Sequence, residues 1–146
     1  LKLAGYHRNH WQGIVGIHIY IDAICYAADL IGNKMVIPFL QKIHKNQFLN
    51  NRSLKKGIEK DHIFERLSLM ELILGRSLAR SGSAEGYEIL IEYLDDMRAV
   101  LAEFAHNALI KITNRDDGKN KEEWRNWLVS KVNKLEPVPL KVRPFD

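Results

Sequence analysis

Apolar residues recur at every third or fourth position along most of this chain, which is the spacing of one face of an α-helix. The clearest run is formed by Ile14, Ile17, Ile21, Ile24, Cys25, Ala28 and Ile31. No stretch shows the strict alternation of apolar and polar residues that is typical of a half-buried β-strand. The pattern therefore predicts an all-α protein.

Turn-forming residues divide this pattern into six predicted helices. Gly32-Asn33 and Ser81-Gly82-Ser83 mark two helix ends, because glycine tolerates the left-handed conformation that closes a helix. Asp61 and Asp95-Asp96 are predicted to cap the helices that follow them. The predicted helices span about residues 12–31, 35–44, 61–80, 84–94, 97–112 and 121–134.

A unit of long helix, tight turn and short helix occurs twice and begins a third time. Placing Gly32 on Gly82, fifty positions later, superposes Phe39-Leu40 on Ile89-Leu90. The next interval, from Leu78 to Leu109, is thirty-one residues, because a polar, basic loop at 45–60 lengthens only the first. One helical pair cannot cover its own apolar face, so we expect about three pairs to stack against one another.

Length and composition support a single core. The chain has 146 residues, of which 46% are apolar, enough for one domain without metal or disulfide staples. We assign residues 1–136 to one helical domain and 137–146, with three prolines, to an extended tail. Cys25 lies in an apolar run and is predicted to be a buried, unreactive thiol. The sequence starts at Leu1 with no leader, which we interpret as a piece of a longer protein.

Neither a membrane nor a nucleic acid is the partner that we expect. The oiliest stretch, 14–28, is shorter than the roughly 20 residues that a bilayer span needs. The net charge of +4 is concentrated between residues 42 and 60, where six bases face one acid (+5), leaving −1 elsewhere. Those bases could contact phosphates, but the later helices are rich in Asp and Glu, so a solvated loop is the preferred interpretation. The candidate phosphate-binding residues are Lys42, Lys45, Arg52, Lys55, Lys56 and Lys60.

The opening segment holds the most conspicuous candidate site, formed by His7, His10, Trp11, His18 and Asp22. His18 and Asp22 lie four residues apart, so one helix face could bring two metal ligands together. Without an HExxH or CxxC motif, we prefer a hydrogen bond between His18 and Asp22, with Trp11 covering the end of the stack. The alternative is a contact surface for an upstream domain. Gly13 and Gly16, each costing about 1 kcal/mol in a helix interior, favour close packing against another backbone.

The remaining polar and aromatic residues are predicted to have structural roles. Glu71 and Arg76 should form a buried ion pair or polar ladder, and His106 is interpreted in the same way. Arg98 should bind backbone carbonyls or Asp95 and Asp96. Trp124 and Trp127, three residues apart, should cover the last helical pair. No nucleophile with a nearby base can be identified by spacing, so no catalytic or metal-binding residue is assigned.

Residues 78–114, LARSGSAEGYEILIEYLDDMRAVLAEFAHNALIKITN, resemble HEAT-like (armadillo-type) repeats. The resemblance rests on a helix ending in leucine and glycine, a short helix with paired aliphatics, an Asp-rich turn, Arg98 and an alanine-rich helix. The closing KITNRDDGKNKEEWRNWL is similar to the last repeat of many bacterial HEAT-like proteins, which often end in a Trp-x-x-Trp helix. The resemblance covers about residues 25–128 and implies a right-handed α–α superhelix. Departures are the basic insertion and the wider spacing of Asp61 and Arg66.

Residues 65–96 are also similar, more faintly, to the helical C-terminal regions of some bacterial FAD-dependent oxidoreductases. That resemblance implies FAD in an upstream domain, and no cofactor in this chain, which has no dinucleotide-binding glycine motif. We predict a non-catalytic interaction or scaffold module that binds a protein partner or an adjacent domain of a larger bacterial protein. The alternatives are an accessory domain that completes an oxidoreductase active site and a DNA-binding HEAT-like protein that uses the basic loop.

Overall fold

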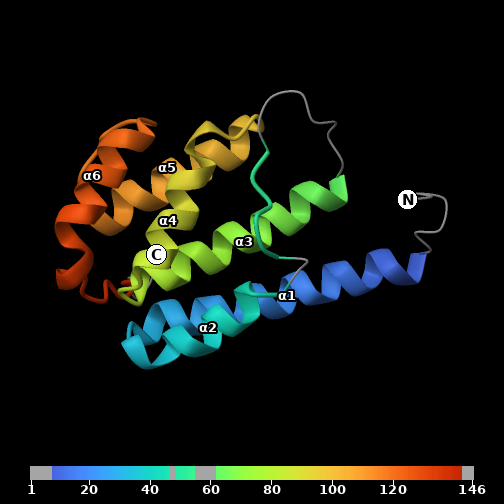
Figure 1. Cartoon of the computed structure of the whole chain (residues 1–146). Coiled ribbons are helices and arrows are strands. Elements are labelled where there is room, and N and C mark those ends of the chain that lie inside the picture. The colour runs from blue at the N-terminus through green and yellow to red at the C-terminus, as the bar shows by residue number, and fades with distance from the viewer. Residues whose placement is uncertain (1–7, 47–48, 55–61, 143–146) are drawn as a thin grey trace.

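A computed structural model describes residues 8–46, 49–54 and 62–142, apart from the side chains of 8–12, 14 and 62–63. Throughout these residues the regular elements are helical, which confirms the all-α prediction (Figure 1). The α-helices are α1 (Arg8–Ile31), α2 (Ile37–His44), α3 (His62–Arg80), α4 (Ala84–Glu92), α5 (Ala99–Thr113) and α6 (Lys121–Lys131). Short 3₁₀ turns occur at Lys34–Val36, Tyr93–Asp95 and Val132–Lys134.

Most predicted helix boundaries lie within three residues of those in the structure, and two helix starts differ in an informative way. Helix α1 begins at Arg8, whereas the pattern predicted a start near residue 12. Helix α5 begins at Ala99 and not at residue 97, and Asp96 does not cap it. Asp96 instead accepts hydrogen bonds from the backbone N–H of Leu54 and from Arg98, which occupies the N-cap position. The predicted cap Asp61 lies outside the described residues.

The three long helices end in the same way. Gly32, Gly82 and Asn114 follow α1, α3 and α5 with φ of 51°, 91° and 57°. This left-handed conformation turns the chain and lets the next N–H groups bond to the last carbonyls of the helix. Ser83, for example, donates its N–H to the carbonyl of Leu78 at 2.9 Å. The glycine stops were predicted correctly, and the third stop uses asparagine.

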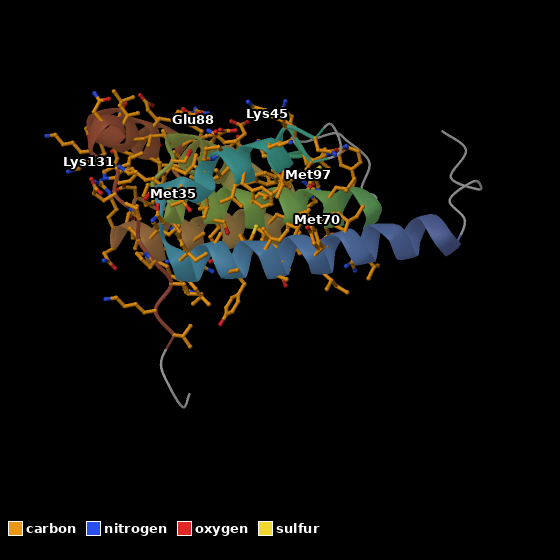
Figure 2. The ribbon with its side chains drawn as sticks, turned by 90° about the horizontal axis from the view of Figure 1, so that it is seen from below. Met35, Lys45, Met70, Glu88, Met97 and Lys131 are labelled. Carbon is orange, nitrogen blue, oxygen red and sulfur yellow. The ribbon has the colours of Figure 1, made fainter. Side chains whose placement is uncertain are left out.

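Helix α3 forms the centre of the molecule. It contacts α1 on one side and α5 on the other, while α2 and α4 also pack against it and α6 packs on α4 (Figure 1). Figure 2 shows Met70 between α3 and α1. The side chains of α3 that are fully buried include Met70, Leu72, Leu74 and Leu78. The described helices thus share one core built around α3, and none of them has the combined length and hydropathy needed to cross a bilayer.

Two helices do approach each other closely, but they do so at Gly75 and Gly86 and not at Gly13 and Gly16 as predicted. A Cβ atom at Gly86 would lie 2.6 Å from the carbonyl oxygen of Gly75, so α3 and α4 touch backbone to backbone. At Gly13 and Gly16, no described atom lies within 4 Å of such a Cβ. The close contact predicted for Gly13 and Gly16 is therefore not made within the described chain. In both figures the first turns of α1 extend beyond the other helices.

The C-terminal segment is extended, as its prolines predicted, and it is tied to the helices. The N–H of Val138 donates to the carbonyl of Arg80 at 2.7 Å, and that of Leu140 to the carbonyl of Asp29 at 2.8 Å. Pro139 packs directly on Gly32. The segment thereby joins the C-terminal ends of α1 and α3.

Candidate functional site

The most unusual surface of the molecule lies on α1 and the start of α2. Eight of the twelve exposed large hydrophobic side chains among the described residues fall between positions 17 and 39. These are Ile17, Ile19, Tyr20, Tyr26, Leu30, Ile31, Met35 and Phe39. Between positions 13 and 31, the exposed described residues include one charged side chain, that of Asp22. Large exposed apolar patches often serve as interaction sites, so these residues are the candidate site of this molecule.

The helical period divides this surface into two stripes. One lies opposite the core and combines bulky Ile17, Tyr20 and Ile31 with small Gly13, Gly16 and Ala27. All six are exposed, at spacings of three, four and, from Tyr20 to Ala27, seven residues. We call these six residues the outer stripe. The other, with Ile19, Asp22 and Tyr26, lines a cavity between α1, α3 and α5. All six residues of the outer stripe are exposed, and a Cβ at Gly13 or Gly16 would meet no described atom within 4 Å.

His18 and Asp22 do not form the predicted hydrogen bond. His18 lines a cavity of about 430 Å³ with Arg66 and Phe104, and its Nδ1 is buried without a partner. Asp22 lines the separate cavity between α1, α3 and α5. Burial, followed by the charge of Arg66, lowers the pKa of His18 against the opposing effect of Asp22. Although His18 and Asp22 lie only four residues apart, their side chains line different cavities.

The other members of the opening cluster are not brought to this point by the described structure. His7 lies outside the described residues, and the side chains of His10 and Trp11, in the first turn of α1, are also outside them. Within the described residues, no three His, Cys, Asp or Glu side chains gather into a group suited to a metal ion. A metal site in this cluster, and the covering of the end of the stack by Trp11, therefore stay predictions.

The basic segment differs from the solvated loop that was predicted. Leu49 and Leu54 are buried, and the backbone N–H groups of Arg52 and Leu54 donate to the carboxylates of Glu71 and Asp96 at 2.8 Å. Two buried carboxylates thus hold residues 49–54 against the helices.

Three of the six candidate phosphate-binding residues are among the described residues, so their role stays a prediction. Lys42 is exposed on α2 and Lys45 directly after it, and the Arg52 guanidinium lies 4.9 Å from the centroid of the Phe64 ring. Figure 2 places Lys45 on the same edge as Glu88, away from α1. Lys55, Lys56 and Lys60 lie outside the described residues.

Glu71 lies at the centre of a buried polar network. A buried polar role was predicted for it, but with Arg76 as the partner. It receives hydrogen bonds from Tyr93 at 2.7 Å and from the N–H groups of Asn51 and Arg52 at 2.8 Å, and it contacts His44 at 2.7 Å. Burial acts to raise the pKa of Glu71, but these hydrogen bonds outweigh it and lower the pKa. The expected partner Arg76 instead places its guanidinium 4.8 Å from the Phe104 ring centroid.

His44 is a buried titratable side chain whose contacts with two carboxylates were not predicted from the sequence. Its two ring nitrogens contact Glu71 at 2.7 Å and Glu85 at 3.2 Å. Burial acts to lower the pKa of His44, but the two carboxylates outweigh it and raise the pKa. The raised pKa favours the protonated ring, which joins α2 to α3 and α4, and no motif spacing connects these three positions.

Several structural predictions are confirmed. Arg98 is buried and donates to Asp96 at 2.8 Å, to the carbonyl of Arg52 and to Ser68. His106 differs from its prediction, because it contacts the exposed Asp116 at 2.8 Å and not a buried partner. Trp124 is fully buried, and its ring lies edge-on to Trp127 with 6.0 Å between centroids. Cys25 is buried, and burial raises its pKa to about 12, so it is an unreactive thiol.

Comparison of the chain with protein-family models, with curated proteins and with solved structures finds no match. The function is therefore argued from the surfaces described above.

Proposed function

We propose that this chain is a non-catalytic interaction module of the HEAT-like, right-handed superhelical type, and that the outer stripe of α1 docks an apolar helix of a partner. The observation that carries the proposal is the outer stripe itself, which is exposed, uncharged and unpartnered. Burying an apolar surface of this kind is favourable by roughly 25 cal/mol per Å².

The composition of the stripe indicates a helix as the occupant. Gly13, Gly16 and Ala27 leave shallow places between the bulky Tyr20 and Ile31, into which the ridge of a second helix fits. The contacts among the long helices continue in order from α5 to α3 to α1, so a further helix on α1 would extend that row. The outer face of a terminal helical repeat is either covered by a neighbour or polar. Among the described residues, the outer stripe of α1 is neither covered nor polar.

The partner's chemistry follows from that of the stripe. Since none of its six residues is charged, the docking helix should present aliphatic and small residues and no unpaired charge at its centre. Such a helix could belong to an adjacent domain of a longer parent protein or to a separate protein chain.

Site-specific crosslinking in the native cell tests the proposal. A photo-reactive phenylalanine analogue replaces Tyr20 in one variant and, as a matched control, the equally exposed Val129 of α6 in another. We expect crosslinks from position 20 to map by mass spectrometry to one apolar helix face, and far fewer from position 129. Introducing Ile31→Glu should abolish the crosslink while the thermal midpoint changes little, because Ile31 is exposed.

Two results would contradict the proposal. Similar crosslink yields at positions 20 and 129 would show that the stripe has no special partner. Crosslinks joining two copies of this chain through the same stripe would replace the partner helix by self-association.

A further inference from the structure

A second surface, separate from the outer stripe, is a half-open cavity of about 630 Å³ between α1, α3 and α5. Arg76 and Arg80 of α3 lie in it, together with Lys111 of α5, Tyr26 of α1 and Leu140 of the C-terminal segment. The volume falls in the usual range for pockets that hold small molecules, about 300–1,000 Å³.

The arginines retain unused hydrogen-bond donors. The Nε atoms of Arg76 and Arg80 are both buried without a hydrogen-bond partner. Arg80 is only 7% exposed and uses Nη1 to donate to the carbonyl of Val138 at 3.0 Å. Arg76 lies against the Phe104 ring, a contact that leaves its N–H groups free in the plane of the guanidinium. Arg80 is thus a buried cation and Arg76 a half-buried one, and a buried N–H donor without a partner is rare in folded proteins.

The cavity also holds carboxylates, and the charges of Arg76 and Arg80 act electrostatically on that of Asp29. Asp29 is 3% exposed and accepts a hydrogen bond from the Ser77 hydroxyl at 2.6 Å. Neither Asp29 nor Asp22 forms an ion pair with Arg76 or Arg80 in the described structure. Lys111, at the exposed rim, adds a third cation, so three bases face two acids.

We propose that this cavity binds the oxyanion, phosphate or carboxylate, of a small organic molecule. Arg76 and Arg80 lie one helical turn apart on α3, so both forks can donate to the oxygens of one anion. Lys111 adds charge at the rim, and the half-exposed Tyr26 and Ile19 offer an apolar surface to the rest of the ligand. The site shares no residue with the outer stripe, so it can exist whether or not that stripe docks a partner.

Titration of the purified chain with phenyl phosphate, inorganic phosphate, benzoate and neutral phenol tests this site. The readout is the pair of Nε–H signals of Arg76 and Arg80 in a nitrogen–proton correlation spectrum. We expect a saturable shift of both signals with phenyl phosphate, and at least tenfold weaker binding in Arg76→Gln, because a charge-assisted hydrogen bond is lost. Tighter binding of phenyl phosphate than of inorganic phosphate would assign the apolar part of the ligand to Tyr26 and Ile19.

Lys111→Gln and Lys131→Gln form the matched control pair. Both lysines are exposed, but Lys131 lies on α6, away from the cavity. Lys111→Gln should weaken phenyl phosphate severalfold and Lys131→Gln should not, and this pair tests the site even if Arg76→Gln does not fold. Equal weakening in both variants, equal binding of phenol, or shifts that never saturate would overturn the proposal.

Discussion

The two ends of this molecule are finished in different ways. At the α6 end, Trp124 is buried against Trp127, and the outer surface carries ion pairs such as Lys121 with Asp95 at 3.0 Å and Arg125 with Glu92 at 3.3 Å. At the α1 end, the outer stripe is apolar and uncovered, and polar contacts help to attach the helices. His44 joins α2 to Glu71 and Glu85, and Asp29 of α1 is joined to Ser77 of α3.

Under the proposed function, this difference separates an end that faces water from an end that a partner helix covers. At the α6 end, packed aromatic rings inside and ion pairs on the surface are suited to contact with solvent. At the α1 end, polar Asp29 and His44 are buried beside core residues such as Ile21 and Cys25, and the outer stripe exposes further apolar side chains. The following changes test that contrast, starting with the largest expected effect.

Trp124→Ala should destabilise the protein most, by about 3–5 kcal/mol, because it removes a fully buried indole and its hydrogen bond to the carbonyl of Gly118. The free energy of unfolding, measured by urea titration followed by circular dichroism, reports the change. Val129→Ala on the same helix removes an exposed side chain and should change this free energy by less than about 0.5 kcal/mol. Equal losses in the two variants would show that the tryptophan pair does not seal the α6 end.

Glu71→Gln should cost about 2–3 kcal/mol. The carboxylate accepts from Tyr93 and from two backbone N–H groups besides contacting His44, and an amide would turn an N–H₂ group toward one of these donors. Glu88→Gln, which changes an exposed carboxylate of α4, is the matched control and should be close to neutral. A loss below about 0.5 kcal/mol for Glu71→Gln would mean that polar contacts do not hold the α2 attachment.

The attachment of α2 should also depend on pH. The raised pKa of His44 means that its contribution is complete below the unfolded value of 6.5 and decreases as pH rises through the folded pKa. The lowered pKa of Glu71 means that its contribution is present above the unfolded value of 4.5 and is lost as pH falls through the folded pKa. The network should therefore be strongest between those two values.

Unfolding free energies of the wild type and His44→Gln, compared across this range, measure the effect. The difference between the two proteins should shrink as pH rises above 6.5. The cost of Trp124→Ala, which removes no titrating group, should stay constant over the same range. A difference for His44→Gln that grows with pH would contradict the assignment of a buried cation.

Local features of this structure could be predicted from the sequence, whereas contacts between distant segments could not. Helix positions and the stops at Gly32 and Gly82 depend on neighbours a few residues away, and these were predicted closely. The partnership of His44 with Glu71 and the capture of residues 49–54 depend on where distant segments meet, which spacing does not encode. Even His18 and Asp22 differ by about 40° around their helix, enough to direct them into different cavities.

The smallest effect concerns Gly16, and its sign distinguishes an open α1 from a covered one. A Cβ at Gly16 meets nothing within 4 Å, so Gly16→Ala should stabilise the isolated chain by about 0.5–1 kcal/mol through helix propensity alone. In Gly86→Ala the added methyl would collide with the backbone of α3, and stability should fall. If the outer stripe docks a helix at close range, Gly16→Ala should reduce the crosslink from position 20 while the thermal midpoint rises. A variant that gains stability and keeps its full crosslink would place the partner elsewhere, because a backbone that approaches Gly16 closely has no room for the added methyl group.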